Sequence, residues 1–134
     1  YQYEKRNQGL TAIAILLNPS AANEKKVDMT IRRVEDVLFH QFKNLKKVHI
    51  YNLFTIRGKS PKDLNHIFAE KGLEGLLYPG SDRVLMEKLR QSDIILQGWG
   101  GPNSMNKELF HRREEQIKEL LKSHCQNKKM YRSF

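Results

Sequence analysis

The alternation of apolar and polar stretches along the chain predicts short buried strands separated by helices. Three apolar runs have the length and composition of buried strands, at residues 13–17, 48–51 and 94–96. Between the first two runs, apolar residues recur at the spacing of a helix, at Ile31, Val34, Val37 and Leu38. Strands that alternate with helices in this way are typical of a parallel sheet flanked by helices.

We expect one domain over residues 1–134, an α/β three-layer sandwich around a central, mainly parallel four-stranded sheet. The strands are expected at residues 11–17, 47–51 and 94–96 and from about residue 129, with residues 1–7 as a lead-in or edge strand. Helices are expected at residues 28–41, 62–70, 81–90 and 105–123. Asp28 fits the N-cap of the first helix, and Ser60 with Pro61 fits the start of the second. The glycines between residues 72 and 80 predict loops.

Polar residues and glycines follow each of the three apolar runs, at the point where the strand is expected to end. The first run is followed by Asn18-Pro19-Ser20, the second by Asn52-Leu53-Phe54 and the third by Gly98-Trp99-Gly100-Gly101. Ligands of open α/β sheets bind outside the carboxyl ends of parallel strands, so three such endings indicate one site. The sequence therefore predicts a ligand or substrate pocket at this edge of the sheet.

The charge of the chain favours an anionic partner. Its 134 residues carry a formal net charge of +9, which favours phosphate backbones, anionic membranes or an acidic protein. No stretch is long and apolar enough to cross a membrane. The single cysteine, Cys125, excludes an internal disulfide, and with no secretory segment in view it favours a cytoplasmic location. Because the chain begins at Tyr1 without an initiator Met, we expect it to be part of a longer protein.

Several common catalytic chemistries have no counterpart in the sequence. It contains no G-x-x-x-x-G-K-[ST] phosphate loop, no G-x-G-x-x-G after a strand, no H-E-x-x-H and no G-x-S-x-G. The five histidines are scattered, so we expect neither a metal site nor a cofactor. What remains is amide chemistry at the strand ends. An amide side chain offers two hydrogen-bond donors and an acceptor but cannot remove a proton. Asn52 is therefore suited to reading the edge of a base, and Asn18 is suited to holding a water or a phosphate.

Structural interpretations of the same residues stay open. Asn18 and Asn52 also fit the capping of a turn and a hydrogen bond to a neighbouring loop. Trp99, between glycines, fits a core anchor better than a stacking platform. Arg32 and Arg33, early in a helix, fit either phosphate contacts or solvated side chains.

The other charged clusters are more ordinary. Arg57-Gly58-Lys59 follows a strand end directly, which makes it the basic loop that best fits a phosphate contact. Lys25-Lys26 and Lys46-Lys47 fit ordinary surface positions. Arg112-Arg113-Glu114-Glu115 is expected to be a mixed, solvated face of the last long helix.

Four segments together resemble a known family. They are Leu16-Leu17-Asn18-Pro19-Ser20, Asp28-x-Thr30-x-Arg32-Arg33, Tyr51-Asn52-Leu53-Phe54 and Gly98-Trp99-Gly100. This combination resembles the bacterial and phage family called domain of unknown function 1643, and the resemblance covers most of the chain. That family in turn looks related to the uracil-DNA glycosylase superfamily, whose first motif ends in Asp-Pro or Asn-Pro after strand one. The resemblance implies a uracil-DNA glycosylase-like fold.

The resemblance also implies roles for individual residues. Asn18 falls at the place of the residue that positions the attacking water, and Asn52 at the place of the amide that reads the base. Two further groups of residues are candidates for the site. The walls of a base pocket are expected at Tyr51, Phe54 and Trp99. Contacts with phosphates or with a partner are expected at Ser20, Arg32, Arg33, Arg57 and Lys59.

Two departures from the glycosylases matter. The most active members carry Asp at the place of Asn18, and their late His-Pro-Ser-type loop is not in this chain. An Asn cannot act as a general base, and the loss of one pre-organised donor costs about 100- to 1000-fold in rate. The resemblance therefore implies a vestigial site with little or no uracil excision.

Three functions compete at this point. The first is a weakly active or inactive glycosylase homologue that binds DNA, weakly and without sequence preference, or an acidic protein of the uracil-DNA glycosylase inhibitor type. The second is an active nucleobase N-glycosylase of unknown base specificity. The third is an interaction module whose strand-end residues are structural. An excision assay separates the second function from the other two.

Overall fold

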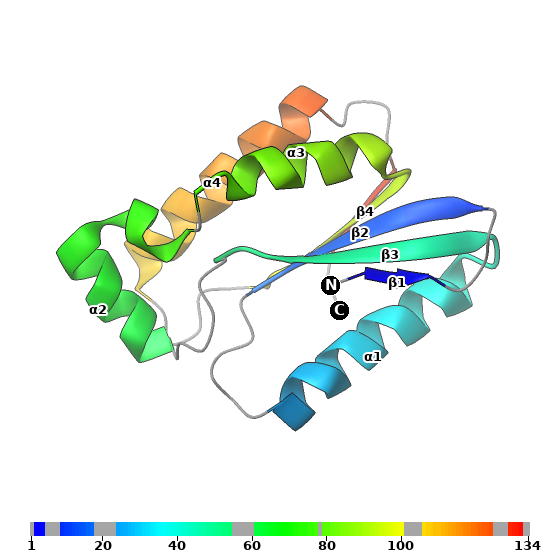
Figure 1. Cartoon of the computed structure of the whole chain (residues 1–134), viewed down its shortest axis with the longest axis horizontal. Helices are drawn as coiled ribbons and strands as arrows, with labels where there is room; N and C mark the ends of the chain where they lie inside the picture. Colours follow the sequence, from blue (N-terminus) through cyan, green and yellow to red (C-terminus); the bar gives the residue numbers. More distant parts are fainter. Residues whose placement is uncertain are drawn as a thin grey trace.

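The strands of the protein form one sheet in the computed structural model, which describes residues 2–4, 9–17, 24–54, 61–77, 79–100, 106–124 and 129–132. The sheet has five strands in the order β1-β3-β2-β4-β5 (Figure 1). They are β1 (Gln2–Glu4), β2 (Leu10–Leu16), β3 (Leu45–Asn52), β4 (Ile94–Gly98) and β5 (Lys129–Arg132). β1 pairs antiparallel with β3, and the other four strands are parallel. The α/β class is confirmed. The sheet has five strands and not the predicted four, because residues 2–4, expected as a lead-in or edge strand, pair with β3.

The helices begin and end close to the predicted boundaries. They are α1 (Glu24–Gln41), α2 (Pro61–Lys71), the 3-10 helix η1 (Leu73–Leu76), α3 (Ser81–Gln91) and α4 (Lys107–His124). The predicted N-cap at Asp28 is wrong, because α1 begins one turn earlier, where Glu24 and two lysines are good helix formers. η1 lies where glycines predicted only loops. None of the described helices is long and apolar enough to span a bilayer.

The sheet separates two apolar clusters, so the molecule has three layers. α1 covers one face, where Val34 and Leu38 pack on strand residues. α3 and α4 cover the other face, and Figure 1 shows them on the opposite side of the sheet from α1. The alternation of side chains along β2 explains why this strand packs against helices on both faces. Ala14 faces α1, while Ile13 and Ile15 face α3 and α4.

The start of α4 is fixed by polar contacts. Asn106 Oδ1 accepts a hydrogen bond of 3.1 Å from the backbone N–H of Leu109, which is the bond of an N-cap. The backbone N–H of Asn106 donates to Asn65 Oδ1 of α2 at 2.6 Å. These bonds place the first helical residue at Lys107 and join α2 to the start of α4.

The amino ends of the strands form the opposite edge of the sheet. Gly9 has a φ of +133°, and a Cβ at this position would collide with the backbone carbonyl of Asn44. The N–H of Leu10 donates to that carbonyl at 2.8 Å. Thr11 and Asp93 exchange two bonds, from Thr11 N–H to Asp93 Oδ2 at 3.0 Å and from Asp93 N–H to Thr11 O at 2.7 Å. Close backbone contacts therefore occupy this edge.

Candidate functional site at the carboxyl edge of the sheet

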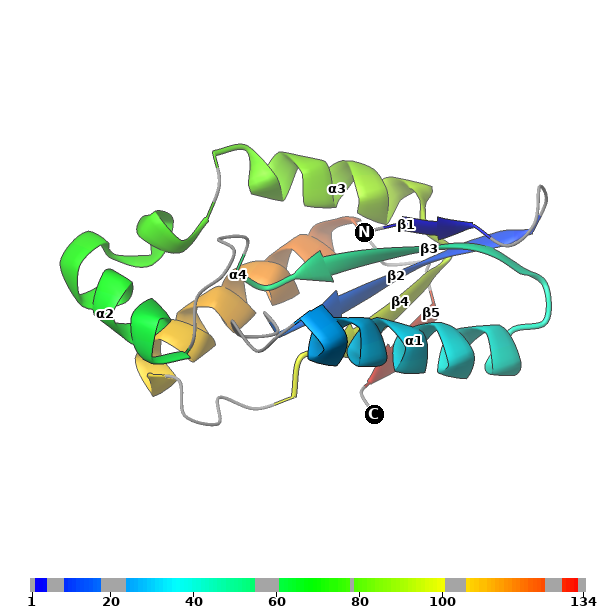
Figure 2. The ribbon, with the colours of Figure 1, turned by 60° about the horizontal axis from the view of Figure 1, so that its bottom comes forward.

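The carboxyl ends of β2, β3 and β4 lie next to one another. Leu16 of β2 is the register partner of Asn52 on one side and of Gly98 on the other. The N–H of Leu53 donates to Leu16 O at 2.8 Å, so the chain after β3 stays bound to the end of β2. Figure 2 shows the arrowheads of β2 and β3 directed to the side of the molecule on which α2 lies. The prediction that these three strands end together is confirmed.

Part of the predicted site lies outside the described residues. Asn18 and Ser20 belong to the connection between β2 and α1, and Arg57 and Lys59 to the connection between β3 and α2. The described elements show only where these connections begin and end, which is at a strand end and at the first turn of a helix. The roles of these four residues stay predictions.

Asn52, the predicted base-reading residue, is the last residue of β3 and is partly exposed. Val48 and Ile50 of the same strand pack in the cluster under α1. Because side chains alternate along a strand, Asn52 shares the α1 face with them. Tyr51 packs with the cluster under α3 and α4. The two neighbours predicted to line one pocket therefore leave the strand on opposite faces of the sheet.

The three aromatic residues predicted to wall a base pocket belong to the core under α3 and α4. Phe54 is completely buried, and Trp99 is 6% exposed. The hydroxyl of Tyr51 donates to the backbone carbonyl of Ser81, the first residue of α3, at 3.0 Å. Burial raises the pKa of Tyr51. A stacking platform needs an exposed ring face, whereas these rings pack against protein side chains, as the core-anchor interpretation of Trp99 expects.

The indole of Trp99 is also held by a polar contact. Its Nε1 donates to Glu114 Oε2 of α4 at 2.7 Å. Oε1 of Glu114 lies 3.6 Å from Lys118 Nζ and 3.6 Å from His111 Nδ1. Gly100 follows Trp99 with a φ of +66° and with open space where a Cβ would lie. A left-handed turn, and not close packing, is therefore what requires this glycine.

The predicted solvated face at residues 112–115 is right for Arg112 and Glu115, which are exposed, but wrong for Arg113. Its side chain is 0% exposed. Nε donates to Leu53 O at 2.6 Å, and the two terminal nitrogens bind both carboxylate oxygens of Asp82 at 2.8 and 3.2 Å. Nη1 also donates to Gln116 Oε1 at 2.9 Å. A buried guanidinium requires partners of this kind, because an unpaired charge in the core is costly.

The sequence does carry a signal for the burial of Arg113. Leu109, Ile117 and Leu121 are buried on α4, and position 113 continues their spacing of four residues. The neighbouring Arg112 is exposed. Helical period, and not the local run of charges, decides which of two adjacent arginines faces the core.

Arg32 and Arg33, the predicted phosphate or partner contacts on α1, are both exposed. They lie about 12 Å along the helix axis from its first residue, at 1.5 Å per residue. Their place is therefore the flank of α1, at a distance from the strand ends. Exposure leaves them accessible to a partner, and their role stays a prediction.

His49 of β3 is a buried polar residue that the sequence did not single out. It is 5% exposed, and its Nε2 has no hydrogen-bond partner in the described part of the structure. Burial, together with the charges of Lys88 and Lys47, lowers the pKa of His49 from 6.5 to about 4. The imidazole is therefore neutral at pH 7. It pairs with Ile13 in the sheet, below the carboxyl edge.

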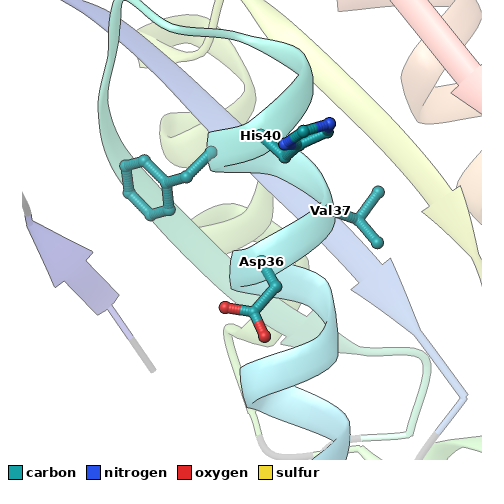
Figure 3. A pocket seen from close by; sticks show the side chains of 4 residues that line it. Asp36, Val37 and His40 are labelled. Carbon is teal, nitrogen blue, oxygen red and sulfur yellow. The ribbon is translucent and has the colours of Figure 1, made fainter.

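The described surface has hollows on α1 and beside the start of α3. The first is lined by Asp36, Val37, Phe39 and His40. Figure 3 shows Asp36 directed away from Val37 and His40, so these side chains do not converge on one ligand. The second includes Asp82, whose carboxylate is bound to Arg113. Within the described ranges, no three His, Cys, Asp or Glu side chains gather where they could hold a metal ion.

Comparison with known proteins leads to a family. No curated protein and no solved structure matches the chain. The family described as Protein of unknown function (DUF1643) matches it over residues 2–133. This match covers every strand of the sheet and the whole carboxyl edge. The chain belongs to the DUF1643 family.

Proposed function

We propose that this chain is a homologue of the uracil-DNA glycosylases with little or no uracil excision activity. In this proposal the α/β sandwich is of the glycosylase type. Its carboxyl edge binds DNA, or an acidic protein that presents carboxylates in place of phosphates. Motif resemblance supplies the superfamily, and the geometry of the edge supports the place of binding.

The observation that carries the proposal is the register of the three central strands. Leu16, Asn52 and Gly98 are side by side, so the three strands that lead into the Asn-Pro-Ser, Asn-Leu-Phe and Gly-Trp-Gly segments end at one edge. Parallel sheets bind their ligands at this edge. Asn52 is partly exposed there and is accessible to a ligand.

Two features support the loss of excision. Asn18 stands where the most active glycosylases carry Asp, and an amide cannot act as a general base for the attacking water. Glycosylases bind a flipped base between aromatic or apolar side chains in a pocket. Phe54 and Trp99 are buried in this conformation and offer no open ring face to such a base.

The electrostatics of the edge support an anionic partner. α1, α2 and α4 each follow a strand of the sheet, so the positive ends of three helix dipoles lie on this side. Lys62 and Lys107 are exposed in the first turns of α2 and α4, but each is followed by an exposed carboxylate, Asp63 and Glu108, so the side chains of these turns add no net charge to the helix dipoles. The net charge of +9 adds attraction at longer range. DNA phosphates and the carboxylates of a DNA mimic are both suited to this field.

An excision assay tests the catalytic half of the proposal. The substrates are single- and double-stranded DNA with uracil, hypoxanthine or a mismatch, and we expect no base release by the wild type. Asn18→Asp is the matched variant, because it supplies the missing carboxylate. Excision by this variant alone assigns the inactivity to residue 18, whereas its inactivity shows that a carboxylate at residue 18 is not sufficient for excision. Rapid excision by the wild type contradicts the proposal and favours an active N-glycosylase.

A binding assay tests the other half. Affinity for a labelled DNA is expected to be weak and to fall steeply between about 50 and 200 mM salt, because phosphate contacts release counterions. An acidic inhibitor protein of the uracil-DNA glycosylase inhibitor type is expected to form a complex. Absence of binding to both probes at micromolar concentration contradicts the proposal.

The sequence also resembles, more narrowly, the pseudo-uracil-DNA glycosylase of staphylococcal cassette elements. No comparison links the chain to that protein. That the gene of this chain lies on a mobile genetic element is therefore proposed from the resemblance alone. The inhibitor titration tests the resemblance to an inactive glycosylase, because binding without excision is the behaviour expected of an inactive glycosylase-like surface.

A further inference from the structure

Arg113 and Glu114 are neighbours on α4, and each binds the chain at the end of a different strand. Arg113 Nε donates to Leu53 O at 2.6 Å, one residue after Asn52. Glu114 Oε2 accepts from the indole of Trp99 at 2.7 Å, directly after β4. β2 lies between these two strands. A single turn of α4 therefore contacts both sides of the candidate edge.

We propose that Arg113 and Glu114 are positioning residues of the carboxyl edge. They set the separation between the segments that follow β3 and β4, and thereby the place of Asn52 in the site. The proposal rests on the proposed function only for the ligand that the edge binds. The positioning of the two segments does not depend on that ligand.

The surroundings of Arg113 make it suited to this role. Its bidentate pair with Asp82 fixes the plane of the guanidinium, and Asp82 lies in the first turn of α3. The plane in turn aims Nε at Leu53 O. Since Leu53 N–H also donates to Leu16 O, both backbone polar groups of Leu53 are bound. The residue directly after Asn52 is thus held from two sides.

Glu114 holds the second segment in a comparable way. Its side chain is 17% exposed, and its charge strengthens the bond from the indole N–H. Trp99 is the single tryptophan of the chain. Its indole N–H therefore gives one resonance and its ring one fluorescence signal, both specific to this edge.

Nuclear magnetic resonance of the whole chain tests the positioning. Arg113→Lys keeps the charge but loses the Nε donor and the bidentate geometry. We expect it to shift the amide resonance of Leu53 and also the indole resonance of Trp99, which Arg113 does not bind. Glu114→Gln is expected to shift both resonances as well. It provides the same test if Arg113→Lys fails to fold, because Glu114 is less deeply buried.

Exposed neighbours on the same helix provide matched controls. Arg112→Lys and Glu115→Gln make the same chemical changes one position away, at exposed sites. Neither is expected to shift the resonances of Leu53 or Trp99. If Arg113→Lys shifts resonances in α3 and α4 but leaves both of these in place, the positioning proposal is wrong.

Ligand affinity separates positioning from a purely structural role. At a temperature where circular dichroism shows every variant folded, we expect Arg113→Lys to weaken binding of a labelled single-stranded DNA about tenfold, against less than about twofold for Arg112→Lys. Equal affinities of the two variants overturn the link between α4 and the site. If the wild type binds neither DNA nor the inhibitor, the proposed function fails, and the resonance shifts alone decide the positioning.

Discussion

The two faces of the sheet are held together by different forces. Under α1, every buried member of the cluster among the described residues is aliphatic, so burial stabilises this face. Under α3 and α4, apolar residues surround Arg113, Glu114 and Tyr51, whose hydrogen bonds reach strand ends or the start of α3. Burial is non-directional, whereas a hydrogen bond fixes a distance and an angle. The α3 and α4 face therefore determines the geometry of the carboxyl edge, and the α1 face contributes stability.

The largest effect is expected from the buried arginine. Arg113→Met fits the volume of the site but leaves the buried Leu53 O without its donor and removes the partner of the Asp82 carboxylate, which is 40% exposed, so the free energy of unfolding should fall by about 3 kcal/mol. Urea denaturation measures this loss. Arg112→Met on the exposed side of α4 is the control, with an expected change within about 0.5 kcal/mol. Similar losses for both variants contradict the assignment of Arg113 to the core.

A core substitution on the α1 face should cost less and leave the edge in place. Leu38→Ala is expected to lower the free energy of unfolding by about 2–3 kcal/mol through a cavity under α1. Val37→Ala, on the same helix but exposed, should change it by less than about 0.5 kcal/mol. The comparison of the faces also predicts an unchanged indole resonance of Trp99 in Leu38→Ala. A shifted indole resonance in a folded Leu38→Ala protein would show that the α1 face also determines the geometry of the carboxyl edge, which contradicts the difference between the two faces.

His49 is expected to make the α3 and α4 face sensitive to acid. Its pKa is about 4 in the folded protein and near 6.5 in the unfolded chain, so below pH 6.5 the unfolded chain takes up the proton first. Stability is therefore fully present above pH 6.5 and falls between pH 6.5 and 4, by about 1–2 kcal/mol after allowance for solvent screening.

Urea denaturation at a series of pH values measures this loss. His49→Gln should flatten the curve between pH 6.5 and 4. Curves of equal slope for His49→Gln and the wild type would show that another group is responsible.

The smallest effect is expected from Glu114. Glu114→Gln keeps the shape of the side chain but removes the charge that strengthens the bond from Trp99, so the free energy of unfolding should fall by about 1 kcal/mol. The emission of the single tryptophan should shift at the same time. Glu115→Gln, at the exposed neighbour, should alter neither quantity. An unchanged emission in Glu114→Gln indicates that the carboxylate does not hold the indole.

The sheet and its carboxyl edge were predictable because apolar runs and strand-ending residues are local signals. The runs at residues 13–17, 48–51 and 94–96 became β2, β3 and β4, and their ends lie together. The distribution of the site between the two faces was not predicted. It follows from the period of two along a strand, which sends Tyr51 and Asn52 to opposite faces.

The polar contacts under α4 were missed for a different reason. Apart from Gln116 on its own helix, Arg113 acquires its partners from α3 and from the end of β3, elements far away in the sequence. No local pattern specifies such partners. The spacing of four from Leu109 and Ile117 predicts only that position 113 faces the core.

A nuclear magnetic resonance titration with an acidic inhibitor protein of the uracil-DNA glycosylase inhibitor type locates the binding site on the sheet. We expect the largest changes at the amides of Leu16, Asn52 and Gly98, at the carboxyl edge. The amides of Gly9 and Asn44, at the opposite edge, should stay in place. Changes centred on Gly9 and Asn44, or the absence of any change at a saturating inhibitor concentration, would contradict the assignment of the site to the carboxyl edge.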